Sequence, residues 1–201
     1  MKIQNIKKIN ITCSQTNIIL IQTDDDNFEV SIDSSKNSES KKIMHIYEND
    51  VLNIFTKFQQ NYVTGFNFKT IFNVTIKGNF NNLDQLTIGS NIGELLIKNT
   101  QLKNFKLESN ISKIKIHNCN LLNNTLELNG SKLNIYDSTL NKTKIESNVG
   151  KIRAYNSLIK DFVKIEANVS SIYLNILNLD EVKQKKLFNI KKIMTHFKIV
   201  K

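Results

Sequence analysis

Glutamate recurs along the chain at nearly constant spacing. The members of this Glu row are Glu108, Glu127, Glu146 and Glu166, which follow a 19-residue spacing until the last interval, longer by one residue. If each interval is one coil of a stacked structure, neighbouring carboxylates lie about 4.8 Å apart. That distance approaches the roughly 5 Å between the two carboxyl groups of a retaining glycosidase. A lysine lies two residues before three of these glutamates, at Lys106, Lys144 and Lys164. This pairing favours a structural ladder in which opposite charges cancel.

A second row combines aromatic rings with a cation. His117, Tyr136 and Tyr155 follow one another at the same 19-residue spacing, and Arg153 lies two residues before Tyr155. Exposed, stacked rings beside an arginine form a platform that suits sugars or an extended peptide. Aromatic rows on a flat sheet also stabilise strand stacking on their own. We take His117, Tyr136, Arg153 and Tyr155 as the candidate binding residues.

Two further rows are expected to be structural. A basic row consists of Lys113, Lys132 and Lys151, and a row of small residues consists of Thr100, Cys119, Ser138 and Ser157. We expect the lysines to be solvated. We expect Cys119 to be a packing residue, because no histidine or acid shares its position. The histidines give no metal-ligand spacing, and no phosphate loop or nucleophile motif occurs. The sequence therefore predicts no catalytic residue, no metal site and no cofactor.

An internal 19-residue repeat positions all of these rows. Residues 105–118 read FKLESNISKIKIHN, and residues 143–156 read TKIESNVGKIRAYN. Within each unit apolar residues alternate with polar ones, which is the pattern of a β-strand. Asparagine recurs at the corners between strands, where it tolerates the left-handed backbone. One apolar column comprises Ile88, Leu107, Leu126 and Ile145.

This repeat predicts an all-β fold, a single β-solenoid that resembles a parallel β-helix. Each 19-residue unit makes one coil, its aliphatic residues point inward, and successive coils stack as parallel strands. One residue is inserted near Phe162, after which the pattern resumes. Leucine-rich repeats, with units of about 20–29 residues, are the alternative fold. Asn99 and Asn118 echo their signature, but no convex segment is left after the second strand of a unit.

The two ends of the chain depart from the repeat. We expect residues 1–71 to form an irregular β-sheet that leads into the solenoid, residues 72–178 to form its coils, and residues 179–201 to form a cap. The cap is expected to be helical, because apolar residues recur at helical spacing after Asp180 and Glu181. These apolar residues are Val182, Leu187, Ile190, Met194 and Phe197.

Composition and charge exclude several classes of protein. The 201 residues carry a net charge of +10, but Arg153 is the only arginine among 28 basic residues. The charge thus reflects a lysine-rich composition and argues against a nucleic-acid partner. Cys13 and Cys119 are too few for a disulfide scaffold, and we expect both to be reduced. We find no signal peptide, and no apolar run approaches the roughly 20 residues of a membrane span, which predicts a cytoplasmic protein without a transmembrane segment.

The corners of the coils resemble those of a known family. They read Glu108-Ser109-Asn110-Ile111-Ser112 and Glu146-Ser147-Asn148-Val149-Gly150. These segments are similar to the bacterial putative-adhesin family of unknown function, which is related to the toast-rack β-domains. The resemblance covers the chain up to about Ile176. It implies a bacterial β-solenoid with a role at or near the cell envelope, in adhesion or in stress sensing.

The sequence therefore predicts a non-catalytic binding or scaffold protein. Its ligand, a protein or a carbohydrate, stays open, and so does its oligomeric state. The alternative is a carbohydrate-active enzyme that uses the Glu row, because β-helix folds host enzymes that cleave polysaccharides.

Overall fold

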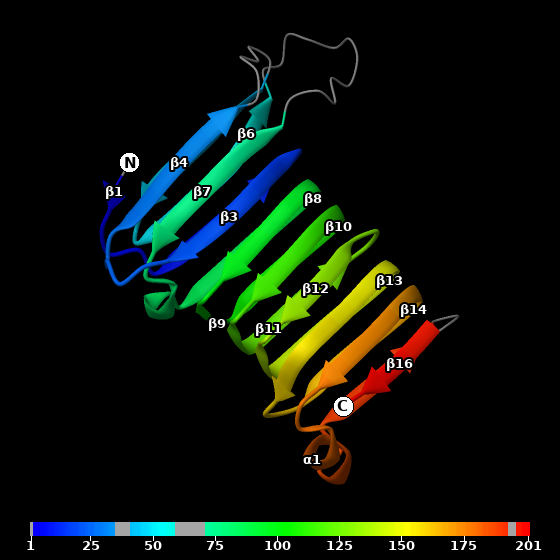
Figure 1. Cartoon of the computed structure of the whole chain (residues 1–201). Helices are drawn as coiled ribbons and strands as arrows, with labels where there is room; N and C mark the ends of the chain where they lie inside the picture. Colours follow the sequence, from blue (N-terminus) through cyan, green and yellow to red (C-terminus); the bar gives the residue numbers. More distant parts are fainter. Residues whose placement is uncertain (1, 35–40, 59–70, 193–195) are drawn as a thin grey trace, which may run out of the picture.

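The computed structural model describes residues 2–34, 41–58, 71–192 and 196–201. Its strands wind into a β-solenoid with the two termini at opposite ends (Figure 1). The regular coils comprise β8 (Gln85–Lys98), β9 (Gln101–Lys103), β10 (Phe105–His117), β11 (Asn120–Leu128), β12 (Lys132–Tyr136), β13 (Thr139–Ile159) and β14 (Val163–Ile176). The predicted all-β solenoid is confirmed.

The strands of consecutive coils pair in parallel with the register that the repeat predicts. Leu107 lies opposite Ile88 in β8 and opposite Leu126 in β11, so its partners are its counterparts one repeat before and one repeat after. Between β13 and β14 the offset is longer by one residue, as in the pair Thr143 and Val163. This confirms the single-residue insertion. A bulge between the two strands then absorbs it, because Ser157 pairs with Ile176 at the regular offset again.

Columns of aliphatic residues fill the interior of the coils. Leu107, Ile116 and Leu126 are fully buried, as are their counterparts on neighbouring coils. Burying one such side chain contributes about 1.5–3 kcal/mol. Left-handed backbone turns the chain at one corner of each coil, at Asn99, Asn118, Asp137 and Asn156, with φ between 47° and 55°. These are corners that the sequence predicts from its recurring Asn and Asp.

The N-terminal part is rich in strands, as expected, but its coils are not stacked in chain order. β2 (Lys8–Cys13) and β3 (Thr16–Gln22) pair in parallel with β8 on one side. On the other side they pair with β6 (Val51–Phe58) and β7 (Phe72–Gly78). The first coil of the chain is therefore inserted between two later segments, and β3 lies between β7 and β8 in Figure 1.

Antiparallel strands complete the N-terminal end of the solenoid. β4 (Phe28–Ser34) pairs with β7, β5 (Lys41–Glu48) pairs with β6, and the short β1 (Lys2–Ile3) pairs with β4. A 3-10 turn, η1 (Phe80–Asn82), joins β7 to β8. Its Phe80 ring packs edge-on against Phe28, with the ring centroids 5.4 Å apart. The strands that precede β7 thus contribute both a coil of the solenoid and part of its end.

The C-terminal segment is only partly helical. A helix is confirmed at α1 (Leu179–Gln184), but the expectation of a helical cap as far as Phe197 is wrong. β15 (Phe188–Lys192) and β16 (His196–Val200) instead pair in parallel with β14 and add one more coil. The physical reason is that Phe188 and Ile190 alternate with polar residues, as a strand on the open edge of β14 requires.

Met194, which the sequence assigns to the same helix, lies outside the described residues. Within the described part of the chain, no helix is long and apolar enough to cross a membrane.

Candidate functional site

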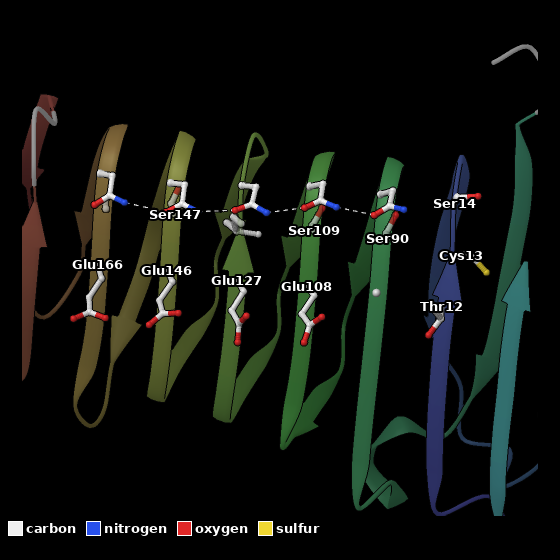
Figure 2. Close-up of a pocket in the computed structure, with 18 of the residues that line it drawn as sticks. Thr12, Cys13, Ser14, Ser90, Glu108, Ser109, Glu127, Glu146, Ser147 and Glu166 are labelled. Carbon is white, nitrogen blue, oxygen red and sulfur yellow. Dashed lines mark hydrogen bonds between the residues drawn. The ribbon is translucent and has the colours of Figure 1, made fainter. Parts of the chain in front are cut away.

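A long groove follows the Glu row across the coils. It has a volume of about 1020 Å³ and extends from Thr12 and Ser14 at the N-terminal coil to Lys191 and Lys192 on the last strand pair. We name it the polar groove. Figure 2 shows the Glu carboxylates side by side, with a hydrogen-bonded line of amides running parallel to them. The repeat produces this arrangement, because Glu and Asn occupy fixed positions two residues apart in successive units.

The line of amides forms the second side of the polar groove. The members of this Asn row are Asn91, Asn110, Asn129, Asn148 and Asn168. Each amide donates to the carbonyl oxygen of the preceding one, over distances of 2.6–2.9 Å. An amide has two N–H donors and two acceptor lone pairs, and the row uses one of each at every inner member. Asn110, Asn129 and Asn148 can therefore both donate to a ligand and accept from it.

Lysines neutralise most of the Glu row. Lys106 pairs with Glu108 at 2.5 Å, and Lys144 pairs with Glu146. Glu166 contacts two lysines, Lys164 at 3.0 Å and Lys191 at 3.7 Å. The hydrogen bond from Lys164 holds the pKa of Glu166 below its ordinary value, and the hydrogen bond to Glu108 raises the pKa of Lys106. Carboxylates held in the ionised form suit hydrogen-bond acceptance better than proton donation.

Glu127 differs from the other members of the Glu row. Threonine occupies position 125, where the other coils of this row carry a lysine, and among the described residues Glu127 makes no ion pair within 4.0 Å. Its side chain is half-buried. This carboxylate lies near the middle of the groove and is the one whose charge is least balanced by its own coil.

The candidate aromatic residues stack in one row on another face. The ring centroids of His117 and Tyr136 are 6.1 Å apart, and those of Tyr136 and Tyr155 are 5.1 Å apart with planes 8° from parallel. Tyr173 extends the row, 5.5 Å from Tyr155 and tilted by 39°. His117 Nε2 also lies 3.3 Å from Asp137 Oδ2. Rings stacked in this way cover one another's faces and present their edges to solvent.

The end of the aromatic row opens into a smaller hollow of about 430 Å³, which we name the basic pocket. Its lining comprises Arg153, Tyr155, Ser171, Ile172, Tyr173, His196 and Lys198. The structure thus brings two of the candidate binding residues, Arg153 and Tyr155, into one hollow. His117 and Tyr136 lie further along the row and do not line it.

Sequence reasoning missed Tyr173, His196 and Lys198. Tyr173 pairs with Arg153 rather than with Tyr155, because the inserted residue shifts the register of β14. His196 and Lys198 belong to the segment predicted to be helical. The alternation of Tyr173 with the buried Ile172 and Leu174 was the available signal for an outward ring.

Lys113 of the basic row and Cys119 of the small-residue row both make contacts within the fold. Lys113 bonds to Glu94 at 2.9 Å, and this bond lowers the pKa of the carboxyl. Cys119 is buried beside Ser138, whose hydroxyl accepts from the Cys119 N–H at 3.0 Å. Burial raises the pKa of the Cys13 and Cys119 thiols, so both are poor nucleophiles.

Within the described ranges, no cluster of three or more His, Cys, Asp or Glu could hold a metal ion.

Comparison with known proteins gives a family match over most of the chain. The model of the family described as Toastrack DUF4097 matches residues 6–184. This confirms the resemblance that the corner segments indicate. No curated protein matches the chain.

Three solved structures are similar to this chain. A putative adhesin from Bacteroides fragilis NCTC 9343 is 15% identical, with a TM-score of 0.49 over 98% of this chain and 94% of that one. A putative adhesin from Parabacteroides merdae ATCC 43184 is also 15% identical, with a TM-score of 0.31 over 100% and 95% of the two chains. A putative cell adhesion protein from Clostridium sporogenes ATCC 15579 is 10% identical, with a TM-score of 0.31 over 86% and 66%.

Proposed function

We propose that this chain, which belongs to the Toastrack DUF4097 family, is a non-catalytic binding protein that holds an extended, uncharged glycan in the polar groove. One observation carries the proposal. The groove runs along the solenoid axis, and a Glu followed two residues later by an Asn recurs on four successive coils, from Glu108 and Asn110 to Glu166 and Asn168. A repeating polymer that lies along the axis meets the same partners at each coil.

The charge balance of the groove favours a neutral ligand. Glu108, Glu146 and Glu166 are compensated by lysines within 4.0 Å, so a polycation gains little there. Their carboxylates still line the groove, which disfavours a polyanion. A hydroxyl-rich chain needs no unpaired carboxylate and is not repelled by the carboxylates. It also brings no net charge that would have to be desolvated.

The hydrogen-bonding groups favour hydroxyls in particular. The carboxylates of the Glu row accept only, whereas each inner amide of the Asn row can donate and accept. A sugar hydroxyl is both donor and acceptor, so one hydroxyl can donate to a Glu and a neighbouring one can accept from an Asn. An extended peptide repeats its outward backbone groups only every two residues, about 6.6 Å at 3.3 Å per residue, which does not match the coil spacing of about 4.8 Å.

The enzyme alternative gains no support from the groove. Retaining and inverting glycosidases both need one carboxyl that is protonated at working pH. Lys164 lowers the pKa of Glu166, which keeps that carboxyl ionised, and Glu108 and Glu146 each lie in contact with a lysine. We therefore assign the Glu row to ligand binding and to coil stacking. Adhesion through a surface glycan, at or near the cell envelope, is the cellular role that we propose for this binding.

Titration calorimetry with neutral oligosaccharides of about six sugars, such as gluco-, xylo- and manno-oligomers, tests the proposal. Replacing Glu127 with Ala removes a charged acceptor without orphaning a lysine on its own coil. A hydrogen bond to a charged group contributes about 1.5–3 kcal/mol, so we expect affinity to fall at least about 10-fold. The matched control is Glu48→Ala on β5, outside the groove.

If the Glu127→Ala variant binds the oligosaccharides with unchanged affinity, the ligand binds outside the polar groove. Release of reducing sugar by the wild-type chain would reinstate the enzyme alternative. If extended peptides bind and none of the oligosaccharides does, the glycan assignment is wrong.

A further inference from the structure

We propose that the basic pocket at the end of the aromatic row is a second ligand site, which binds a sugar ring that carries an anionic group. It lies apart from the polar groove and shares no lining residue with it. β13, β14 and β16 form it together: β13 supplies Arg153 and Tyr155, β14 supplies Tyr173, and β16 supplies Lys198. The site exists only because the C-terminal segment adds another coil.

The cations of this pocket are unbalanced. Arg153, His196 and Lys198 all line it, and among the described residues none has an acidic partner within 4.0 Å. The lining contains no carboxylate. Along the Glu row, by contrast, Lys106, Lys144 and Lys164 each pair with a glutamate that lines the polar groove. A pocket with two permanent positive charges and no negative one favours an anionic ligand.

Arg153 is suited to fix the orientation of that anion. It is the only arginine of the chain, and its guanidinium presents two parallel N–H groups that match the two oxygens of a carboxylate or sulfate. Lys198 lies opposite Tyr173 in the register of β14 and β16, and Arg153 lies opposite Tyr173 on the other side. The two cations therefore flank one ring.

The rings favour a sugar over a free inorganic anion. Within the row, Tyr136 and Tyr155 stack nearly in parallel and cover each other's faces. At the pocket the row ends, because the next coil offers Lys198 in place of another ring. Tyr155 and Tyr173 are tilted by 39° there, and both line the hollow. A ring with an apolar face and polar edges can pack against them while its anionic group reaches Arg153.

The volume sets the size of the ligand. About 430 Å³ lies in the lower part of the range of small-molecule sites, roughly 300–1,000 Å³, and suits one or two sugar rings rather than a long strand. We infer that the pocket binds a terminal or side-branch acidic sugar, and that it adds charge selectivity to a molecule whose main groove is neutral.

Titration of the full chain with three disaccharides tests the inference. One carries a glucuronate, one carries a sulfate, and one is neutral. We expect the charged ligands to bind at least 10-fold more tightly than the neutral one, and the tighter of the two identifies the anion. Raising the salt concentration from about 0.05 M to about 0.5 M should weaken this binding several-fold by screening.

Variants locate the site. Arg153→Gln should weaken binding of the charged disaccharide at least 10-fold, and Arg153→Lys should restore only part of it, because lysine keeps the charge but lacks the planar fork. Lys151→Gln on the same strand, outside the pocket, is the matched control and should bind normally.

Equal affinity for charged and neutral disaccharides would overturn the proposal, and so would full binding by Arg153→Gln. Tighter binding of short single-stranded oligonucleotides than of either charged sugar would also overturn it. Because Glu127→Ala should leave this binding intact, failure of the polar groove and failure of the basic pocket are distinguishable.

Discussion

Tyr136 and Tyr155 lie on consecutive coils with their ring centroids 5.1 Å apart and their planes within 8° of parallel. The coil spacing imposes this distance, because the residues are directly paired in the parallel register of β12 and β13. The rings therefore stabilise each other before any ligand arrives. Within the row the ring faces are therefore covered by neighbouring rings and only the ring edges stay exposed, so a ring face is open to a ligand only at the end of the row.

Replacing Tyr136 with Ser should lower the stability of the solenoid modestly. An aromatic pair contributes about 0.5–1.5 kcal/mol beyond its buried area, and a chain of this size loses about 2–4 °C in Tm per kcal/mol. We expect thermal unfolding, followed by circular dichroism, to shift down by several degrees. Lys132→Ser on the same strand is the control and should leave Tm within about 1 °C of wild type. Unchanged Tm in Tyr136→Ser would show that the stacked rings add nothing to stability.

Replacing Leu126 with Asp should prevent the coils from stacking. Leu126 is fully buried between Leu107 and Ile145, so the new carboxylate is left without a partner in an aliphatic column. We expect a loss of more than about 4 kcal/mol, seen as aggregation or loss of the sheet spectrum. Thr125→Asp is the matched control. Its side chain points outward between Lys106 and Lys144, so it should fold normally.

The regular coils could be predicted because their signal is local and repeated. Leu107 and its counterparts recur at a fixed interval and alternate with polar residues, and a parallel stack is the way to bury all of them. The position of β2 and β3 could not be predicted in the same way. Residues such as Ile9 and Ile18 fit the interior of any coil, and only the folded packing places them between β8 and the later strands β6 and β7.

The basic pocket is harder to foresee than the polar groove. Arg153 and Tyr155 follow the repeat and can be found from it. Tyr173 does not follow the 19-residue spacing, because the inserted residue shifts it by one position. Lys198 lies in a segment whose apolar residues also match helical spacing. Period-two and helical patterns overlap in so short a segment, and the unpaired edge of β14 decides between them.

Acid should weaken the contact between Glu166 and its lysines. The hydrogen bond from Lys164 holds the pKa of this carboxyl below the ordinary value of 4.5, and the charge of Lys191 is a smaller cause. A carboxyl whose pKa is lowered by folding contributes stability above its unfolded pKa, and the contribution is lost as pH falls through the folded pKa. Glu166→Gln should therefore unfold at lower temperature than wild type at pH 7.

The gap in Tm between Glu166→Gln and wild type should close as pH falls below 4.5. Thermal unfolding scans between pH 7 and pH 2.5 give this comparison. Glu48→Gln, on the exposed edge strand β5, serves as the control and should follow the wild-type profile throughout. A gap that is independent of pH would mean that the glutamine acts through packing and not through charge.

Asn118 should contribute to the stability of the fold more through its backbone conformation than through its side-chain hydrogen bond. Asn118 has a φ of 52°, and its amide donates to Asn99 Oδ1 at 3.0 Å. Alanine disfavours this left-handed conformation by about 1–2 kcal/mol, whereas glycine adopts it freely. We expect urea unfolding to show Asn118→Ala destabilised by about that amount and Asn118→Gly substantially less affected, although both lose the amide bond.

Asn110 provides the matched site for this comparison. It belongs to a similar amide ladder but lies outside the left-handed region, so glycine there should be no better than alanine. Equal losses for the two Asn118 variants would assign the cost at that corner to the hydrogen bond, because the bond is what both substitutions remove.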